Sequence, residues 1–495
     1  MGIMYHSTRG GDSPVSASQA VLKGISENGG LFVPDRIPKL DKSFRELSAM
    51  TYQELAYEVM KLYLSDYTEE ELKDCIARAY DAKFDSPLIA PLHEADGAEF
   101  LELFHGTTIA FKDMALSILP YLMTTAARKN GVRNEIVILT ATSGDTGKAA
   151  LAGFADVPGT KIIVFYPKYG VSPIQEKQMV TQQGDNTHVV GITGNFDDAQ
   201  TAVKKMFQDR DFAQELDQNG YQFSSANSIN IGRLVPQIVY YVYAYASLLA
   251  GGRIKDGEEI NIAVPTGNFG NILAAYYAKQ MGLPVHKLIC ASNENKVLYD
   301  FFTTGIYDRR REFILTSSPS MDILISSNLE RLIYRIAGED SAACADLMRQ
   351  LSETGCYEIT REMQDGLKDF YGNYLTEEET AAVIADIFKK DQYVIDPHTA
   401  VAAGVYRKYA AGGDSRQAVI ASTASPYKFT KSVMSALGYE TEGKDDFELA
   451  DELSEISHVP VPGAVEAIRN APVIHQTVVD PADMPAAVRR FLKIG

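Results

Sequence analysis

The sequence has no tryptophan and little cysteine or histidine. Among its 495 residues there are four cysteines and eight histidines. No C-x-x-C pair occurs among the cysteines, which are Cys75, Cys290, Cys344 and Cys356, and no H-x-H or H-x-x-x-H spacing occurs among the histidines. Disulfide frameworks and zinc sites both need such spacings. We therefore expect free, mostly buried thiols, no bound metal and a reducing compartment.

The sequence also has no hydrophobic run that is long enough to cross a membrane. The longest, residues 238–250, has 13 residues and contains four tyrosines, whereas a spanning helix needs about 20 apolar residues. Residues 1–11 lack the charged-then-apolar pattern of a secretion signal. We expect a cytoplasmic protein that does not bind membranes.

Cationic residues are scarce relative to acidic ones. The chain has 47 lysines and arginines against 65 aspartates and glutamates, a formal net charge of −18. This charge repels nucleic acids and anionic lipids, so neither is an expected partner. A small-molecule substrate is therefore the expected partner, and no obligate protein partner is evident from the sequence. An anionic substrate would need a local cluster of donors that overcomes the global field.

The chain is too long for a single core, so two or three lobes are expected. Residues 1–92 are predicted to be mainly helical, with capping-box spacings that begin at Ser16, Thr51 and Thr68. Residues 431–495 are predicted to pack on the rest of the chain, and their acidic stretch 445–455 is expected to be a solvated face or a loop.

The central region, residues 93–430, alternates short apolar runs with longer helical stretches. Buried parallel strands are predicted at 136–139, 162–165, 188–190, 262–264, 288–290 and 418–420. One helical insertion interrupts the alternation at about 330–390. This pattern predicts an α/β fold with mostly parallel sheets.

A glycine-containing loop follows the predicted strand at 262–264. It consists of Gly267, Asn268, Phe269, Gly270 and Asn271, and a helix-like stretch follows it. The N-terminus of that helix would offer unpaired N–H groups to a phosphate. The alternative is an ordinary turn between a strand and a helix. A dinucleotide fingerprint is excluded because the G-x-G-x-x-G spacing fails.

A second small-residue loop follows the strand at 136–139 and contains Ser143, Gly144, Asp145 and Thr146. A nucleotide-binding P-loop fails here, because Thr142 replaces the first glycine and Ala149 replaces the hydroxyl residue after the lysine. Such a loop can bind a carboxylate and the flat face of a cofactor. A simple polar turn is the alternative.

Lys112 stands between an apolar residue, Phe111, and an acidic one, Asp113. Most lysines are solvated, but this one precedes an apolar helix face that would place it near a packed interior. A desolvated lysine has a lowered pKa and can form a Schiff base with an aldehyde cofactor. A late loop carries Thr423, whose hydroxyl could hydrogen-bond a pyridine nitrogen.

Taken together, these segments resemble the threonine synthase family, which are pyridoxal-phosphate enzymes of the tryptophan-synthase-β fold type. Similar blocks lie at 5–10, 28–34, 104–113, 143–147, 267–271, 318–323, 396–399 and 422–429. The insertion is similar to the longer fungal and bacterial branch. Two positions depart from many relatives, Thr107 and the stretch 425–427, and both flank presumed site loops.

The resemblance implies two open, mostly parallel-sheet lobes and conversion of O-phospho-L-homoserine and water to L-threonine and phosphate. It implies that Lys112 holds pyridoxal 5′-phosphate as a Schiff base and moves protons, that Thr423 faces the ring nitrogen, and that the 267–271 loop binds the cofactor phosphate. Substrate would be bound by Thr107, Thr108, Ser143, Gly144, Asp145 and Thr146. Another lyase of this fold type, such as a serine/threonine dehydratase, or a non-catalytic cofactor-binding relative are the alternatives.

Overall fold

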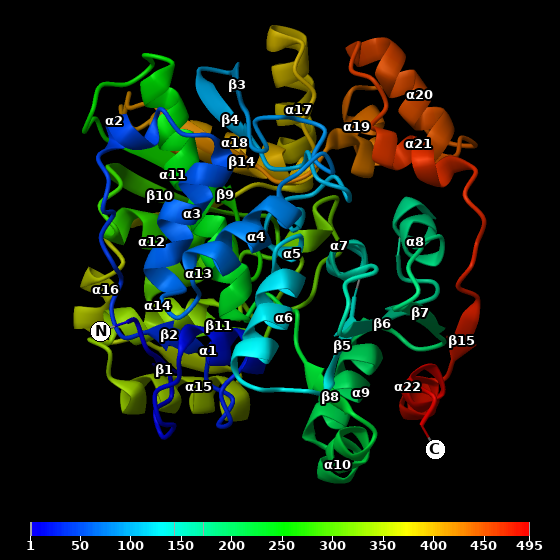
Figure 1. Cartoon of the computed structure of the whole chain (residues 1–495). Helices are drawn as coiled ribbons and strands as arrows, with labels where there is room; N and C mark the ends of the chain where they lie inside the picture. Colours follow the sequence, from blue (N-terminus) through cyan, green and yellow to red (C-terminus); the bar gives the residue numbers. More distant parts are fainter. Residues whose placement is uncertain (1, 143, 172, 495) are drawn as a thin grey trace.

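Two parallel-stranded sheets lie side by side in the computed structural model, which describes residues 2–142, 144–171 and 173–494 (Figure 1). The large sheet has the order β13 (Phe370–Tyr374), β10 (Val285–Ser292), β9 (Ile260–Pro265), β14 (Ala418–Ser422), β4 (Ala98–Glu102) and β3 (Leu92–Ala95). The small sheet has the order β15 (Thr477–Val479), β7 (Thr187–Ile192), β6 (Thr160–Pro167), β5 (Glu135–Ala141) and β8 (Tyr221–Ser224). Only β3 pairs in antiparallel fashion within these sheets, which confirms the α/β prediction.

Two short antiparallel ribbons complete the strands that the structure describes. They pair β1 (Tyr5–Ser7) with β2 (Phe32–Pro34), and β11 (Ile306–Asp308) with β12 (Cys356–Glu358). All six strands expected from the sequence are present, and each is two to five residues longer than its predicted core.

The helices of the N-terminal and small-sheet regions follow the capping signals of the sequence. They are α1 (Ala17–Lys23), α2 (Phe44–Leu47), α3 (Tyr52–Tyr63), α4 (Glu69–Ala79), α5 (Asp113–Leu116), α6 (Leu119–Lys129), α7 (Asp145–Phe154), α8 (Pro173–Val180), α9 (Phe196–Gln208) and α10 (Arg210–Gln218). The expected capping boxes at Ser16, Thr51 and Thr68 are all formed, each side chain accepting from the backbone three residues later.

The remaining helices surround the large sheet or belong to the C-terminal segment. They are α11 (Ile231–Ala250), α12 (Gly270–Gln280), α13 (Val297–Thr304), α14 (Leu329–Ile336), α15 (Ser341–Thr354), α16 (Arg361–Asp365), α17 (Glu377–Asp391), α18 (Pro397–Ala410), α19 (Thr430–Ala436), α20 (Asp446–Ser457), α21 (Gly463–Arg469) and α22 (Met484–Leu492), with short 3-10 helices η1 (Pro319–Met321), η2 (Pro426–Lys428) and η3 (Pro481–Asp483). No helix in the described part of the chain is both long and apolar enough to cross a membrane.

The central strands β9 and β14 of the large sheet are buried on both faces, because helices cover each face. Alternate residues of β9 separate accordingly: Ile262 and Val264 pack in the cluster that contains α11 and α12, whereas Ala263 packs with α17 and α18. This two-residue period explains why the strands read as continuous apolar runs in the sequence.

The insertion at 330–390 differs from the helical prediction. It contains α14 to α17, but it also contributes β12 and β13, and β13 pairs with β10 at the edge of the large sheet. The aromatic stretch of β13, with Phe370, Tyr371 and Tyr374, favours a strand beside an existing edge, and that tertiary context is not visible locally.

The C-terminal segment spans both halves of the molecule. Its helices α19 and α20 pack near α17, and β15 then pairs in parallel with β7 at the edge of the small sheet; Figure 1 shows this segment in orange and red along one side. The acidic stretch 445–455 is not a loop but most of α20, capped by Asp445, with Leu449 and Leu453 buried. Its charges occupy only the solvated face of an amphipathic helix.

Candidate active site

Loops from three adjacent strands meet at one edge of the large sheet. Strands β9, β14 and β4 are neighbours and parallel, so the loops that follow them leave the same edge. The backbone N–H of Phe111 donates to the carbonyl of Thr423 (2.8 Å), and the N–H of Ser425 donates to the carbonyl of Ile109 (3.0 Å). These bonds join the β4 and β14 loops and hold the backbone next to Lys112.

Lys112 directs a largely buried amine toward two oxygen atoms. Its Nζ lies 3.0 Å from Ser320 Oγ and 3.4 Å from Asp145 Oδ2, and its side chain is 11% exposed. Burial lowers the pKa of Lys112, and the charges of Lys428 and Arg233 lower it further against the opposing effect of Asp145. A lowered pKa leaves more of the amine unprotonated and nucleophilic.

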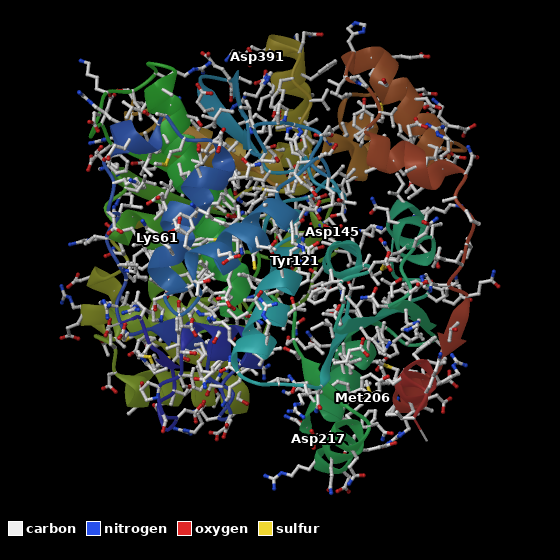
Figure 2. The ribbon with its side chains drawn as sticks, viewed as in Figure 1. Lys61, Tyr121, Asp145, Met206, Asp217 and Asp391 are labelled. Atoms are coloured by element: carbon white, nitrogen blue, oxygen red, sulfur yellow. The ribbon has the colours of Figure 1, made fainter. Side chains whose placement is uncertain are left out.

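Asp145 connects the two halves of the molecule. It begins α7 of the small-sheet half, and Figure 2 labels it near the middle of the molecule. Its Oδ1 lies 3.1 Å from the Nζ of Lys428, whose side chain is completely buried and also donates to the carbonyl of Thr108 (2.9 Å). Burial alone would raise the pKa of Asp145, but Lys428 and Lys112 outweigh it and hold the pKa well below its usual range. The carboxylate is therefore ionised and suited to holding amines.

A buried histidine fixes the position of Ser320. The backbone N–H of Ser320 donates to Nε2 of His398 (3.1 Å), so the ring proton lies on Nδ1 and is donated to Asp396 Oδ2 (2.6 Å). Ser320 Oγ then lies 3.0 Å from both Lys112 Nζ and Asp145 Oδ2. The hydroxyl can accept from the amine and donate to the carboxylate at once.

The 267–271 loop forms the N-terminus of α12, as predicted. Phe269 has φ = +65°, a left-handed conformation that is strained for a side chain with Cβ. Its buried ring packs against Phe302 and Phe370, which hold this conformation in place. A Cβ on Gly267 would lie 2.4 Å from the carbonyl oxygen of Ser320, so only glycine fits there.

This helix N-terminus presents several donors without acceptors. The N–H groups of Gly270, Asn271 and Ile272 have no acceptor among the residues that the structure describes. The side chain of Asn271 accepts from the hydroxyls of Tyr240 (2.6 Å) and Tyr241 (2.5 Å) through Oδ1. Its Nδ2 is buried without a partner in the described chain. An anion at this position would satisfy these groups.

Three family models match the chain. They are "Threonine synthase N terminus" at residues 4–80, "Pyridoxal-phosphate dependent enzyme" at 91–425, and "Threonine synthase, C-terminal" at 399–479. The chain belongs to the threonine synthase family. Its cofactor class is therefore pyridoxal phosphate, as predicted from Lys112 and the two loops.

Individual relatives agree with this membership. Threonine synthase of Saccharomyces cerevisiae is 36% identical over 92% of this chain and 93% of its own length. The crystal structure of a threonine synthase from Brucella melitensis, described as bound to pyridoxal phosphate, superposes with a TM-score of 0.86 at 34% identity, covering 99% of this chain and 100% of that one. Threonine synthase-like 1 of Pongo abelii is 41% identical over 86% of this chain, which spans 59% of that longer relative.

The residues present fit a phosphorylated aldehyde cofactor. Lys112 supplies an amine of lowered pKa, and the N-terminus of α12 supplies unpaired donors for a phosphate. Thr423 is buried on the β14 loop beside Phe111. Contact of the cofactor with Thr423 and with the 267–271 loop stays a prediction for this threonine synthase family member, and the geometry suits it. The loop residues are Gly267, Asn268, Phe269, Gly270 and Asn271.

The predicted substrate residues occupy varied environments. Thr107 is exposed. Thr108 is buried, and its hydroxyl donates to Asp113 Oδ1 (2.6 Å), so this hydroxyl proton is already bonded within the chain. Gly144 has φ = +140°, and a Cβ there would lie 2.5 Å from the side chain of Gln175. Thr146 is half-buried. Ser143 lies outside the described residues. Substrate binding by these residues stays a prediction.

Several site residues had been given no role from the sequence, although Ser320, Lys428 and the pair Asp396–His398 lie within the blocks that carry the family resemblance. They are Lys428, Ser320, Gln175, Arg233 and the pair Asp396–His398. Two carried usable signals. Lys428 stands in the same strand-end loop as Thr423, and Arg233 is the only charged residue between positions 231 and 250, in an otherwise uncharged helix. A lone charge in such a helix is costly unless a partner or ligand meets it.

Proposed function

We propose that this chain converts O-phospho-L-homoserine and water to L-threonine and phosphate, with pyridoxal 5′-phosphate held by Lys112. The observation that carries this proposal is the Lys112 amine, desolvated and placed 3.0 Å from Ser320 Oγ, beside a helix N-terminus with unpaired donors. Membership of the threonine synthase family supports the choice of substrate.

When bound, the cofactor delocalises the electron pair that is left on carbon after a proton is removed. The chain's own contribution is proton transfer and positioning. When it is not bonded to the cofactor, Lys112 Nζ would be a free amine that could take or give a proton at the substrate carbons. Ser320 Oγ and Asp145 Oδ2 hold this nitrogen in place between transfers.

The charges around Lys112 suit repeated proton transfer. Asp145 favours the ammonium form, whereas burial, Lys428 and Arg233 favour the neutral amine. The net effect is a pKa of Lys112 below that of an exposed lysine, so that more of the amine is neutral at a given pH. That balance is what a group acting alternately as base and acid requires.

The decisive experiment incubates the purified, cofactor-loaded protein with O-phospho-L-homoserine and measures L-threonine and phosphate together. Equal amounts of both products support the proposal, and Lys112→Ala should abolish them. Formation of a 2-oxo acid from L-serine or L-threonine, with no product from O-phospho-L-homoserine, would instead identify a dehydratase. A loaded protein that transforms none of these compounds would be a non-catalytic cofactor binder.

A further inference from the structure

A buried carboxylate in the large-sheet half, Asp396, accepts four hydrogen bonds. It caps α18, where Oδ2 accepts from the backbone N–H of His398 (3.0 Å) and Oδ1 from that of Thr399 (3.0 Å). Two side-chain donors add to this cap: Nδ1 of His398 bonds to Oδ2 (2.6 Å), and the Thr399 hydroxyl bonds to Oδ1 (2.5 Å). All three residues are buried. A helix N-cap needs only the backbone bonds, so capping does not account for the two side-chain bonds.

The first side-chain bond leads to Lys112. Because Asp396 accepts the Nδ1 proton, Nε2 of His398 keeps its lone pair and accepts from the backbone N–H of Ser320 (3.1 Å). The carboxylate thereby fixes the ring tautomer, as the aspartate of a catalytic triad does. Ser320 Oγ lies 3.0 Å from Lys112 Nζ. Asp396, His398 and Ser320 form an amine branch that ends at the reactive nitrogen.

The second side-chain bond leads to Thr423. A carboxylate only accepts, so Thr399 gives its one hydroxyl proton to Asp396, and its oxygen is left as an acceptor 3.2 Å from Ser422 Oγ. Ser422 is the last residue of β14 and directly precedes Thr423, the residue predicted to face the ring nitrogen of the cofactor. Asp396, Thr399 and Ser422 form a ring branch that ends at this loop.

We propose that Asp396 is a positioning residue for both groups that the cofactor ring is predicted to meet. Its amine branch holds Ser320 against Lys112, and its ring branch holds the backbone of Thr423. The inference deepens the proposed function and rests on it. Both branches start from one rigid carboxylate, so the two loops are held at a fixed spacing, and a displacement of about 1 Å is enough to slow a positioned reaction strongly.

The experiment compares full-length wild type with variants that cut one branch each. His398→Asn and His398→Phe lack an acceptor at the position of Nε2, whereas His398→Gln retains one. Thr399→Val removes the hydroxyl of the ring branch, and Thr399→Ser restores it. Asp396→Asn keeps a good capping side chain but has one acceptor oxygen instead of two. The matched control is Thr380→Val, because the buried Thr380 hydroxyl on α17 donates to the carbonyl of Thr376 (2.8 Å).

Three of the measurements do not depend on turnover. Visible absorbance follows the rate constant of Schiff-base formation when pyridoxal 5′-phosphate is added to the cofactor-free protein, and it also gives the affinity and the absorbance maximum of the product. The Tm of the cofactor-free protein reports folding. On the loaded protein, kcat and KM for O-phospho-L-homoserine are measured.

Loss of one positioning hydrogen bond predicts that Schiff-base formation and kcat both fall about tenfold in His398→Asn, with KM within about twofold. His398→Gln should lose less. In a Ser320→Ala background, His398→Asn should change neither rate by more than about twofold, because the hydroxyl through which it acts is already absent. Thr399→Val should instead shift the absorbance maximum and weaken cofactor binding about threefold or more, and Thr399→Ser should not. Asp396→Asn should show at least one of these two sets of effects.

Native rates in folded His398→Asn, together with a native spectrum and affinity in folded Thr399→Val, would overturn the proposal. Equal losses from His398→Asn with and without Ser320, or a lower Tm as the sole effect of Asp396→Asn, would show a purely structural role and would overturn it too. If His398→Asn does not fold, His398→Phe replaces it in the same cycle with Ser320→Ala. If wild type makes no threonine, the proposed function fails, but Schiff-base formation, cofactor affinity and the spectrum still decide the role of Asp396.

Discussion

The ion pair between Lys428 and Asp145 offers a quantitative test of how the site is held together. Replacing Lys428 with methionine removes a fully buried ammonium group that lies 3.1 Å from Asp145 Oδ1. Breaking a buried pair on one side costs about 3–5 kcal/mol. Asp145 would keep Lys112 at 3.4 Å and the Gln175 amide at 3.0 Å. We therefore expect a loss near the lower end, about 3 kcal/mol of unfolding free energy.

The assay is a double-mutant cycle with Lys428→Met, Asp145→Asn and the double variant, measured by denaturant unfolding of the cofactor-free protein. The double variant leaves neither charge unpaired, so it should be about 2 kcal/mol more stable than the sum of the single losses predicts. The exposed pair Arg349–Asp346 serves as the control and should show no measurable coupling. Additive losses at Lys428 and Asp145 would refute the reasoning.

Three further predictions concern the loops around this pair. Burial would lower the pKa of His105, but Asp85 and Glu102 raise it from 6.5 to about 9. The stabilisation from the protonated His105 is therefore complete below pH 6.5 and is lost as the pH rises toward 9. The unfolding free energy measured in a pH series should vary less with pH in His105→Gln than in wild type. Ser320→Ala should lower kcat roughly tenfold and shift the pH–rate profile with little change in KM or Tm; an unchanged kcat and profile would contradict the positioning role. Gly267→Ala should weaken cofactor binding about tenfold or more, since the new Cβ meets backbone. Gly463→Ala, with open space around it, is the control. An unchanged affinity in Gly267→Ala would contradict cofactor binding by the 267–271 loop.

Much of the fold was predictable from local signals. The six β-branched runs are strands because they are bounded by loops and buried on both faces, as with Ile262 to Val264 in β9. The capping boxes at Thr51 and Thr68 formed because they depend on four consecutive residues. Lys112 and the 267–271 loop could be singled out for the same reason, since each is a short motif whose chemistry is encoded in neighbouring residues.

What the sequence could not predict depends on contacts between distant segments. Strand β13 forms at an edge provided by β10, and α20 is a helix because an apolar face hidden among its charges has a partner to pack on. The position of Ser320 beside Lys112 joins residues 208 positions apart. Asp145 was expected to contact the substrate, which stays a prediction, but the position of its carboxylate between two lysines from other loops could not be read from the sequence. Such pairings follow from topology rather than from local pattern.

The charges of these distant residues resolve an apparent conflict in the composition. A chain of net charge −18 should repel a cofactor and a substrate that each carry a phosphate group. Around the site, however, four buried or largely buried cations face three buried carboxylates; they are Lys112, Lys148, Lys428 and Arg233, with Asp113, Asp145 and Asp396. Four minus three leaves a formal charge of +1, with Lys112 counted as protonated, in a region that is screened little by solvent. Burial together with Lys428 lowers the pKa of Lys148 to about 8, with Asp113 opposing, as expected where cations are in excess. This local excess would attract a phosphate group, so the protein should gain affinity for phosphate esters from its local charge while its remaining surface stays acidic.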